Sequence, residues 1–591
     1  MAGGLLNLIA IGNQNIMLTG NPTKSFFKTS YAKYTNFGMQ KFRIDQIGQT
    51  NLHLTQSTHY RFEISRYGDL LMDTYLVVKL PNIWSPILKY INPYDNTQTS
   101  FEYRPYEFQW IKNIGSQLIE EVTYTIDGRI VQKYSGKYIQ NIVERDFDRN
   151  KKDLFDKLTG NVSELNNPSN YGRRKYYPNA WKRNDNDISG IEPSIHEYTL
   201  YIPLNSWFMF TSHMAFPLIS LQKNVFEINF KLRPIQQLFT IKNVIYDIST
   251  NPSNIYVDVC NNVMNNMFEN NYYNYNNIPR IVPQQNIDAN YAYYRFIQQP
   301  PVRDISSIGY LYPERRTNIN YDVHLITTQC FLDTDERRLF IYGTRDYLLK
   351  EVKEHKFEKI NKSTKVKIES NGLISSWMWY FQRDDVGSRN EWSNYTNWEY
   401  EDEQPRKLEK LMDNNGNMIY YNTTNNLYNF DISQNIYITG ESPTVYEQTN
   451  RKLIMRNFGI LVDGKYREDT QDQGIYHGIE KYNRNNGLSK DGIYVYNFAL
   501  ENNPYKYQPS GAFNTNKFRN VELEFNIYEN PPIDLSNVNF TTICDPETGE
   551  VIATSKEPTS IYKYNYNLHV FEEKYNILRF FAGMADFAYI G

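Results

Sequence analysis

Within residues 225–232 (VFEINFKL), apolar and polar residues alternate strictly from Phe226 onward, and this pattern constrains the fold more than any other feature of the chain. Successive side chains of a strand point to opposite faces, so the alternation predicts a strand with one buried face and one polar face. The same pattern returns at residues 521–527 (VELEFNI), half of the 591-residue chain further on. Two such strands at this spacing suggest a duplicated β domain.

Further strand signals occur in the first half of the chain. Residues 74–80 (TYLVVKL) are β-branched and apolar, and a proline follows them. Residues 118–126 (LIEEVTYTI) lead into Asp127-Gly128, and the strand pattern resumes at residues 129–131. Because Asp-Gly is typical of a two-residue hairpin turn, we expect a β-hairpin there.

Helical signals are scarce, and the best one lies near the middle of the chain. Asp333 can cap a helix, and Glu336 follows three residues later, as in a capping box. Apolar residues then recur near helical spacing, at Leu339, Tyr342, Leu349 and Val352. We expect a short helix over residues 333–356 that connects the two halves.

Two long polar segments interrupt the strand pattern. Residues 249–290 and 401–437 are rich in Asn and Tyr and show little periodicity. Asn favours turns and polar loops, and loops of this length in compact domains are usually functional. We expect both segments to be insertions that face solvent or partners.

Charge and cysteine content exclude several classes of protein. The 63 Lys and Arg against 66 Asp and Glu leave no basic excess to neutralise phosphates, which disfavours a dedicated nucleic-acid binder. Three Cys cannot form a disulfide framework, and they indicate a reducing compartment. No apolar run reaches the roughly 18 residues of a membrane span. Residues 1–20 are a poor signal peptide, because no Lys or Arg precedes their apolar stretch.

No motif for catalysis, a metal or a cofactor is found. The HExxH, GxSxG, Walker A and GxGxxG patterns are absent from the sequence. His53 and His59 fit ordinary strand or loop residues better than a metal pair. Asp384 and Asp385 are adjacent and would point to opposite faces of a strand, whereas acid–base catalysis needs two carboxylates facing one bond. We therefore expect no enzyme, no metal and no cofactor.

Five Asn-x-Ser/Thr sequons occur, no more than chance predicts for a chain rich in these residues. Glycosylation at a sequon requires access to the glycosylation machinery, and the sequence shows no secretory signal. The candidate glycosylation sites are Asn161, Asn361, Asn394, Asn422 and Asn539.

Six stretches, in a fixed order along nearly the whole chain, carry a specific resemblance. They are residues 18–22 (LTGNP), 331–338 (FLDTDERR), 390–397 (NEWSNYTN), 492–500 (GIYVYNFAL), 508–514 (QPSGAFN) and 575–579 (YNILR). Together they resemble the signature stretches of the major capsid protein of nucleo-cytoplasmic large DNA viruses, and the Asn- and Tyr-rich loops are most similar to mimivirus-type members. The family-motif residues, with structural roles implied by the resemblance, are Asn21, Pro22, Asp333, Asp335, Arg337, Trp392, Asn394, Tyr395, Pro509, Ser510, Gly511 and Asn514.

The resemblance implies an all-β fold of two tandem eight-stranded jelly rolls with long loop insertions and a short connecting helix. The expected parts are an N-terminal arm at 1–25, a first jelly roll at 26–332, the connector helix at 333–356 and a second jelly roll at 357–591. The insertions at about 249–290 and 401–437 would lie on an outer, tower-like surface or at trimer contacts.

The resemblance also implies a mechanical function. It implies a homotrimer of pseudo-hexagonal outline that tiles the icosahedral shell of a virion and is assembled in the host cytoplasm. The implied partners are further copies of the chain, neighbouring capsomers, and minor capsid and vertex proteins. The inner face would lie close to an internal membrane, with no transmembrane segment and no direct contact with nucleic acid. The apolar arm residues expected on that inner face are Leu5, Leu6, Leu8, Ile9 and Ile11.

Two other functions fit parts of the sequence. A lectin-like carbohydrate-binding protein would share the jelly-roll architecture, and it would need a concave aromatic platform. The candidate aromatic residues are Trp377, Trp379, Trp392 and Trp398. A β-type glycoside hydrolase would need a pair of facing carboxylates, which the sequence does not show. Glycan-array binding would favour the first function, and turnover abolished by a single Asp or Glu substitution would favour the second.

Overall fold

The structure is a computed structural model, and it describes most of the chain. The described residues are 3–29, 31–48, 50–85, 87–91, 101–105, 107–172, 177–178, 192–242, 282–283, 293–299, 317–398, 400–402, 411–412, 418–419, 452–488, 490–528, 540–544, 551–556 and 564–589. Most of the predicted insertions at 249–290 and 401–437 therefore lies outside the described residues.

Eight antiparallel strands form the first roll, in two four-stranded sheets. One sheet has the order β1 (Phe37–Asp45), β15 (His324–Leu332), β4 (Leu70–Leu80), β10 (Tyr198–Pro203). The other has the order β3 (Thr58–Glu63), β11 (Phe226–Leu232), β8 (Ile119–Ile126), β9 (Arg129–Tyr134). The two sheets pack face to face around an apolar core, as in a jelly roll.

The second roll repeats this arrangement. Its first sheet is β16 (Arg345–Ile360), β28 (Tyr566–Phe581), β18 (Leu373–Arg383), β23 (Ile493–Asn497). Its second sheet is β17 (Thr364–Ile368), β25 (Val521–Ile527), β21 (Met455–Val462), β22 (Lys465–Asp472). If the eight strands of each roll are numbered in chain order, both rolls have the sheets 1-8-3-6 and 2-7-4-5. The prediction of two tandem eight-stranded jelly rolls is confirmed.

The two strands with strict alternation occupy equivalent places. β11 and β25 are the seventh strands of their rolls, and both alternate between buried and half-buried residues along their whole length. In β11 the buried side chains include Ile228 and Phe230, and in β25 they include Leu523 and Phe525. The alternation in the sequence therefore located the same strand of each roll.

The predicted hairpin is also present. β8 and β9 pair antiparallel, and Asp127 and Gly128 between them have φ angles of 47° and 78°. A turn with positive φ at both central residues matches the twist of the flanking strands, which is why Asp-Gly is favoured there.

The predicted connector helix is correct only in its first part. Helix α9 spans Thr334–Ile341 and is capped by Asp333, whereas the chain from Arg345 onward is strand β16. The prediction of a helix to residue 356 is wrong because Tyr347 and Leu349 are buried two residues apart, as on a strand. β16 pairs with β28 from Arg345 onward, and this long pairing overrides the weak helical spacing.

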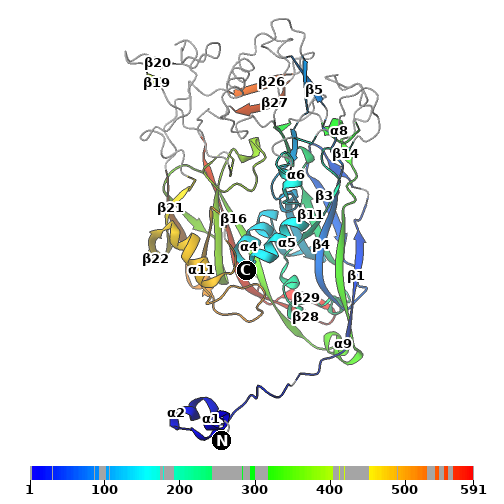
Figure 1. The fold of residues 1–591 in the computed structure, drawn as a ribbon. Coiled ribbons are helices and arrows are strands. Elements are labelled where there is room, and N and C mark those ends of the chain that lie inside the picture. Colours follow the sequence, from blue (N-terminus) through cyan, green and yellow to red (C-terminus); the bar gives the residue numbers. More distant parts are fainter. Residues whose placement is uncertain are drawn as a thin grey trace.

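Helices occur mainly between the fifth and sixth strands of each roll. In the first roll these are α4 (Gly136–Asp146), α5 (Arg149–Leu158) and α6 (Ser163–Asn166). In the second roll they are η9 (Ile475–Ile479), a π-helix, and α11 (Glu480–Arg484), which continues it. Figure 1 shows α4 and α5 between the two rolls, whereas α11 lies at the outer edge of the second roll.

The connections between strands three and four, and between strands seven and eight, carry the extra elements of both rolls. They include β5 (Ile87–Ile91) in the first roll, and β19 (Leu411–Met412), β20 (Met418–Ile419), β26 (Phe540–Cys544) and β27 (Val551–Lys556) in the second. These elements gather at one end of the body in Figure 1, and α9 lies at the other. The backbone of β13 (Val282–Pro283) pairs with β27, which joins the first roll's insertion to the second roll.

The remaining short elements complete the described chain. They are α1 (Gly3–Ile9), α2 (Asn13–Thr19), β2 (Leu52–His53), β6 (Phe101–Pro105), β7 (Glu107–Trp110), α3 (Ile114–Leu118), η1 (Trp207–Met209), η2 (Ser212–Met214), η3 (Leu218–Ser220), η4 (Ile235–Gln237), β12 (Phe239–Lys242), α8 (Tyr293–Phe296), β14 (Asn318–Ile319), η8 (Val386–Ser388), β24 (Phe513–Asn514), η10 (Thr515–Lys517) and β29 (Met584–Phe587).

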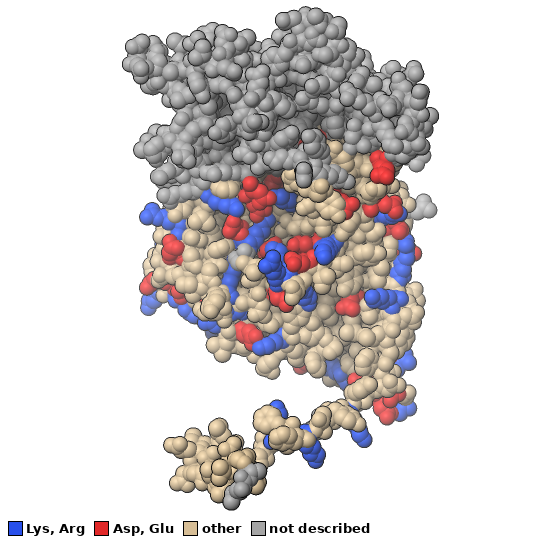
Figure 2. Space-filling view, in the orientation of Figure 1, with Lys and Arg blue, Asp and Glu red and all other residues tan. Residues whose placement is uncertain are grey.

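The N-terminal arm projects away from the body at the end that carries α9 (Figure 1). Every described residue from 3 to 41 is exposed, including the apolar residues of α1 and α2. Figure 2 shows the arm with blue basic residues and no red acidic ones. Within the described residues, no helix has the length and apolar character needed to cross a membrane.

Candidate functional site: the contact between the two rolls

Helix α4 of the first roll is the centre of the contact between the rolls. All of its residues are buried, from Gly136 to Asp146. Its Tyr138 ring lies 5.4 Å from the ring of Phe571 on β28, and Lys137 Nζ donates a hydrogen bond of 2.6 Å to Gln382 Oε1 on β18. A helix that carries charge yet is buried all round must have partners on every side. α4 therefore joins its own roll to a sheet of the second roll.

A fully buried ion pair crosses this contact. Arg145 Nη2 on α4 lies 2.8 Å from Glu573 Oε1 on β28 and 2.6 Å from Asp146 Oδ2. The side chains of Arg145 and Glu573 are both 0% exposed. Removing one partner of such a pair leaves an uncompensated charge in a low-dielectric site, which costs about 3–5 kcal/mol. The pair therefore ties the position of the second roll to that of α4.

Further groups from two strands and a loop of the second roll, and from α4 itself, satisfy Glu573. Lys350 Nζ lies 3.0 Å from Glu573 Oε2, and Ser376 Oγ donates to the same oxygen at 2.8 Å. Asn502 Nδ2 also donates to it, at 3.1 Å, while Tyr138 Oη donates to Oε1 at 2.9 Å. Burial opposes the ionisation of Glu573, but the charges of Arg145 and Lys350 and these hydrogen bonds lower its pKa well below the usual range.

A loop of the second roll makes a second contact between the rolls. Asn390 Nδ2 donates to the backbone oxygens of Gln236 and Phe239, at 2.9 and 3.0 Å. Trp392 Nε1 donates to the backbone oxygen of Gln237 at 3.0 Å, and the guanidinium of Arg233 lies 4.1 Å from the centre of the Trp392 ring. This loop carries the family motif NEWSNYTN, so the motif includes residues that clamp the second roll onto the first.

Two more motif residues shape this loop. Asn394 Nδ2 donates to Trp398 O at 2.8 Å, and its Oδ1 accepts from the backbone of Thr396 at 2.9 Å. The Tyr395 ring stacks on Tyr380 of β18 at 4.0 Å. Gly492 packs against this point with φ +83°, and a Cβ there would collide with the Tyr395 carbonyl oxygen. The structure therefore brings Trp392, Asn394 and Tyr395 together at the contact.

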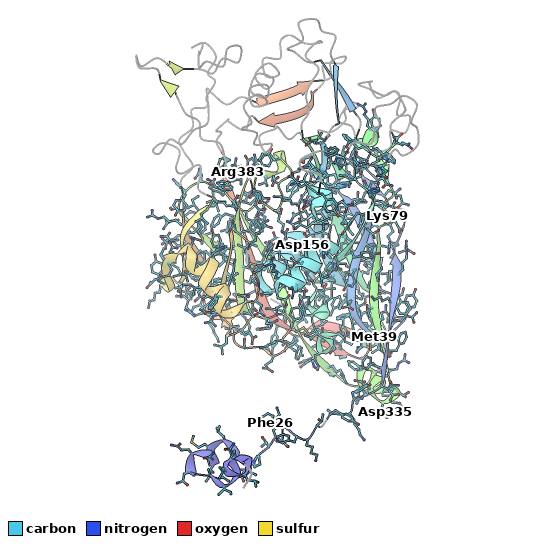
Figure 3. The ribbon with its side chains drawn as sticks, in the orientation of Figure 1. Phe26, Met39, Lys79, Asp156, Asp335 and Arg383 are labelled. Carbon is cyan, nitrogen blue, oxygen red and sulfur yellow. The ribbon has the colours of Figure 1, made fainter. Side chains whose placement is uncertain are left out.

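The mid-chain motif residues lie elsewhere, around α9. Asp333 Oδ1 accepts from Thr334 N at 2.8 Å and caps the helix, while Arg337 Nε lies 3.0 Å from Asp69 Oδ1. Asp69 Oδ2 also accepts from Leu332 N, so Arg337 ties α9 to the start of β4. Asp335 is exposed at the end of the body opposite β5, β26 and β27 (Figures 1 and 3).

The other motif residues occupy two further places. Ser510 Oγ donates to Glu501 O at 2.6 Å, next to Pro509 and to Gly511, whose φ is +137°. Asn514 Oδ1 accepts from Asn516 N at 3.1 Å and begins η10. Asn21 and Pro22 lie in the exposed arm. These motif residues thus have turn and cap roles and do not converge on one site.

The candidate glycosylation sites differ in access. Asn394 is 1% exposed and both ends of its amide are hydrogen-bonded, so the folded chain offers no site there, and that candidate is wrong. Asn361 is exposed, and Asn161 is half-buried with its Oδ1 accepting from Asn113 N. Asn422 and Asn539 lie outside the described residues.

The residues considered for carbohydrate binding, catalysis or metal binding pack in the core or pair with neighbouring side chains and backbone groups. Trp377 and Trp379 are 0% exposed in the core of the second roll, so they form no open platform. Asp385 pairs with Arg383 at 2.9 Å, while the neighbouring Asp384 accepts from Asn565 N. His53 and His59 lie on β2 and β3, and no group of three metal-ligating side chains occurs within the part of the chain that the structure describes.

A buried His–Glu pair lies at the edge of the same contact. His569 Nδ1 on β28 lies 2.9 Å from Glu354 Oε1 on β16, and the His569 ring stacks on Tyr380 at 4.9 Å. Burial, helped by the positive charge of Lys137, lowers the pKa of His569 to about 4. Burial also lowers the pKa of Lys137 to about 7. His569 is therefore neutral at pH 7 and can donate its Nδ1 proton to Glu354.

The functional residues that sequence patterns missed are the charged ones. Arg145 and Glu573 are 428 residues apart, and nothing in either neighbourhood marks them as partners. The one available signal is that VFEEK at residues 570–574 places two carboxylates in a strand that otherwise reads as apolar. A buried strand with charges must have partners for them, but the sequence does not identify those partners.

Comparisons with known proteins agree with this architecture. Residues 25–275 match the family model described as the major capsid protein N-terminus, and residues 336–586 match that of the large eukaryotic DNA virus major capsid protein. The chain is 22% identical to the major capsid protein of Phaeocystis pouchetii virus, over 100% of both chains. It is also 22% identical to the probable capsid protein 4 of Acanthamoeba polyphaga mimivirus, over 91% of this chain and 94% of that protein. Capsid protein 1 of the same virus is 33% identical over 239 residues, which cover 40% of this chain but only 36% of that relative.

Solved structures show the same fold. PBCV-1 VP54, fitted into a reconstruction of the virophage Sputnik, matches with a TM-score of 0.55 and 17% identity, over 96% of this chain and 100% of that one. The Faustovirus major capsid protein matches with a TM-score of 0.54 and 10% identity, over 97% and 96%.

Replacing Arg145 with Met should destabilise the protein by about 3–5 kcal/mol, because it removes the guanidinium that pairs with the buried carboxylates of both Glu573 and Asp146. Denaturant titration measures this loss. The control is Arg579→Met, since Arg579 forms a half-exposed ion pair with Asp346 and this variant should stay close to the wild type in stability. Equal losses in the two variants would show that the buried pair does not hold the rolls together.

Stability should fall as the pH is lowered from about 6.5 to about 4. The folded-state pKa of His569 is below its unfolded value, so the unfolded chain binds more protons in this window, and acid favours unfolding. The pKa shift of His569 contributes on the order of 3 kcal/mol to the change in unfolding free energy across this pH window. His569→Gln should flatten the pH dependence of the unfolding free energy, whereas His213→Gln, at an exposed position, should not. Parallel curves for wild type and His569→Gln would contradict the assignment.

Proposed function

The chain belongs to the family of major capsid proteins of large eukaryotic DNA viruses and is a component of the capsid shell of the virion, and from this premise we propose that its working unit is a homotrimer of pseudo-hexagonal outline. Trimers of this kind would tile an icosahedral shell through repeated lateral contacts. The role is mechanical, and we propose no catalytic activity for it.

One observation carries the trimer proposal: each chain contains two rolls with the same strand order. Three copies of a two-roll chain supply six similar lobes, and six similar lobes around a threefold axis give an outline close to a hexagon. Closed rotational symmetry is the usual way in which identical chains form a finite assembly. A hexagonal outline also allows units to tile a surface without gaps.

The two ends of the body differ, and this difference suggests which end of the chain faces the outside of the shell. The described strands of the long connections, among them β5, β26 and β27, gather at one end, and the arm leaves from the other (Figure 1). We propose that the insertions face outward, and that the arm lies on the inner face against neighbouring capsomers or minor capsid proteins. Vertex proteins are further partners, and an internal membrane lies near the inner face. The shell makes no direct contact with nucleic acid, and assembly takes place in the host cytoplasm.

The composition of the arm suits an inner-face contact. Its apolar residues are unusually exposed for a folded protein, among them Leu8, Met17 and Leu18. Exposed apolar side chains in such number mark a surface that another molecule covers. The only charges in residues 1–36 are those of Lys24, Lys28 and Lys33. We propose that an assembled shell covers this segment.

The purified protein should have a mass of about 210 kDa in solution, three times 70.1 kDa. Light scattering coupled to size-exclusion chromatography at micromolar concentration measures it. A stable 70.1 kDa monomer would contradict the trimer proposal.

Deleting residues 2–15 should leave the trimer intact and impair the shell, because every described residue of this segment is exposed. Trimer mass tests the first part, and electron microscopy of particles assembled with the deleted chain tests the second. Normal trimers together with normal shells would remove the proposed role of the arm.

A further inference from the structure

We propose that the exposed face of η9 and α11 docks onto a second copy of this chain, on the outer face of the sheet β1-β15-β4-β10. Here the outer face of a sheet is the face turned away from the core of its own roll. This inference rests on the proposed trimer and names the two surfaces that form it. Its basis is an internal precedent, since the chain already makes the equivalent contact once, between its own two rolls.

The precedent is the contact of α4 with the second roll. α4 connects the fifth and sixth strands of the first roll, and it packs on the outer face of the sheet β16-β28-β18-β23. Met378, Tyr380 and Phe571 on that face belong to the same apolar cluster as the core of the first roll. Their neighbours Trp377 and Trp379 face the opposite way, into the core of the second roll. This sheet is thus apolar on both faces.

The equivalent helix of the second roll lacks such a cover. η9 and α11 also connect a fifth strand, β22, to a sixth, β23. One face is attached to the roll, because Tyr476 is buried there and Lys481 Nζ donates to Ile493 O at 2.6 Å. The other face exposes Ile479 by 54% and Tyr482 by 90%. These two residues are three apart on the helix and therefore lie on one side.

The equivalent sheet of the first roll is open on its outer face. Leu76 on β4 and Leu325 on β15 belong to the core, so their neighbours Tyr75 and Ile326 point outward. Tyr75 pairs with Ile326 across the sheet, and both are only half-buried. On the next strand, β10, Tyr201 is 40% exposed. Charged side chains share this face, such as Lys79, which forms an ion pair with Glu197. The surface therefore mixes aromatic, apolar and charged residues, and it corresponds in position to the surface that α4 covers on the second roll.

The positions of the two surfaces suit a closed ring. α11 lies at one side of the body and the sheet β1-β15-β4-β10 at the other, as the labels for Met39 and Lys79 show (Figures 1 and 3). A contact between two different surfaces of identical chains joins them head to tail, and it gives a ring when the rotation closes. Here the same kind of contact would alternate within and between chains through all six rolls of the trimer.

Three Tyr→Asp substitutions test the inference. Tyr482→Asp places a charge on the docking helix, and Tyr201→Asp places one on the receiving sheet. Tyr342→Asp is the matched control, because Tyr342 is 75% exposed beyond α9 and belongs to neither surface. Light scattering at equal micromolar concentration measures the trimer fraction of each variant, and circular dichroism with thermal unfolding checks that each one is folded.

Tyr482→Asp and Tyr201→Asp should each reduce the trimer at least about tenfold and yield folded monomers, since truncating a buried interface aromatic commonly has this effect. Tyr342→Asp should remain trimeric. Should one of the tyrosine variants fail to fold, Ile479→Asp on the same helix face repeats the test. If folded Tyr482→Asp and Tyr201→Asp proteins keep the trimer fraction of the wild type, this inference is overturned, whereas the proposed trimer is not. A monomeric wild type would overturn the trimer itself and the inference with it.

Discussion

The buried ion pair between Arg145 and Glu573 is the interaction on which the arrangement of the two rolls depends. Both side chains are fully shielded from water, and Glu573 collects partners from β16, β18 and α4. Buried charges tolerate few alternative geometries, because any displacement leaves one of them unpaired. Apolar packing of Tyr138 on Phe571 supplies area, and the charges fix how the two surfaces meet. The rolls are therefore one rigid building block rather than two domains on a linker.

The fixed contact between the two rolls gives the duplicated fold a consequence for assembly. A sheet that is apolar on both faces must be covered twice, once by its own roll and once by a neighbour. In the second roll the neighbour is α4, and in the first roll the same position on the sheet is open. A chain in which one of these sheet faces is covered and the equivalent face is uncovered can bury the uncovered face by binding a second copy of itself. The described elements β5, β26 and β27 of the long strand connections lie at one end of the body, and the arm leaves from the other.

The sequence predicted the repeating parts of this structure well and the unique parts poorly. Strict alternation located β11 and β25, and Asp127-Gly128 located a hairpin, because these signals are local. The prediction of a helix to residue 356 was wrong because, in a short window, the apolar spacing of a strand can resemble that of a helix. The pairing of β16 with β28 makes this segment a strand. Arg145 and Glu573 could not be predicted as partners, since contacts across 428 residues leave no local pattern. The motif residues Trp392 and Tyr395 were identified by resemblance, and their place in the contact emerged only from the fold.

The central claim is that a two-roll chain closes a ring by repeating its own internal contact. Single-particle electron microscopy of the purified protein tests this most directly. The account predicts particles with threefold symmetry and six similar lobes, in which the contacts within and between chains look alike. Isolated two-lobed particles at micromolar concentration, or a ring whose contacts between chains differ from those within a chain, would contradict it.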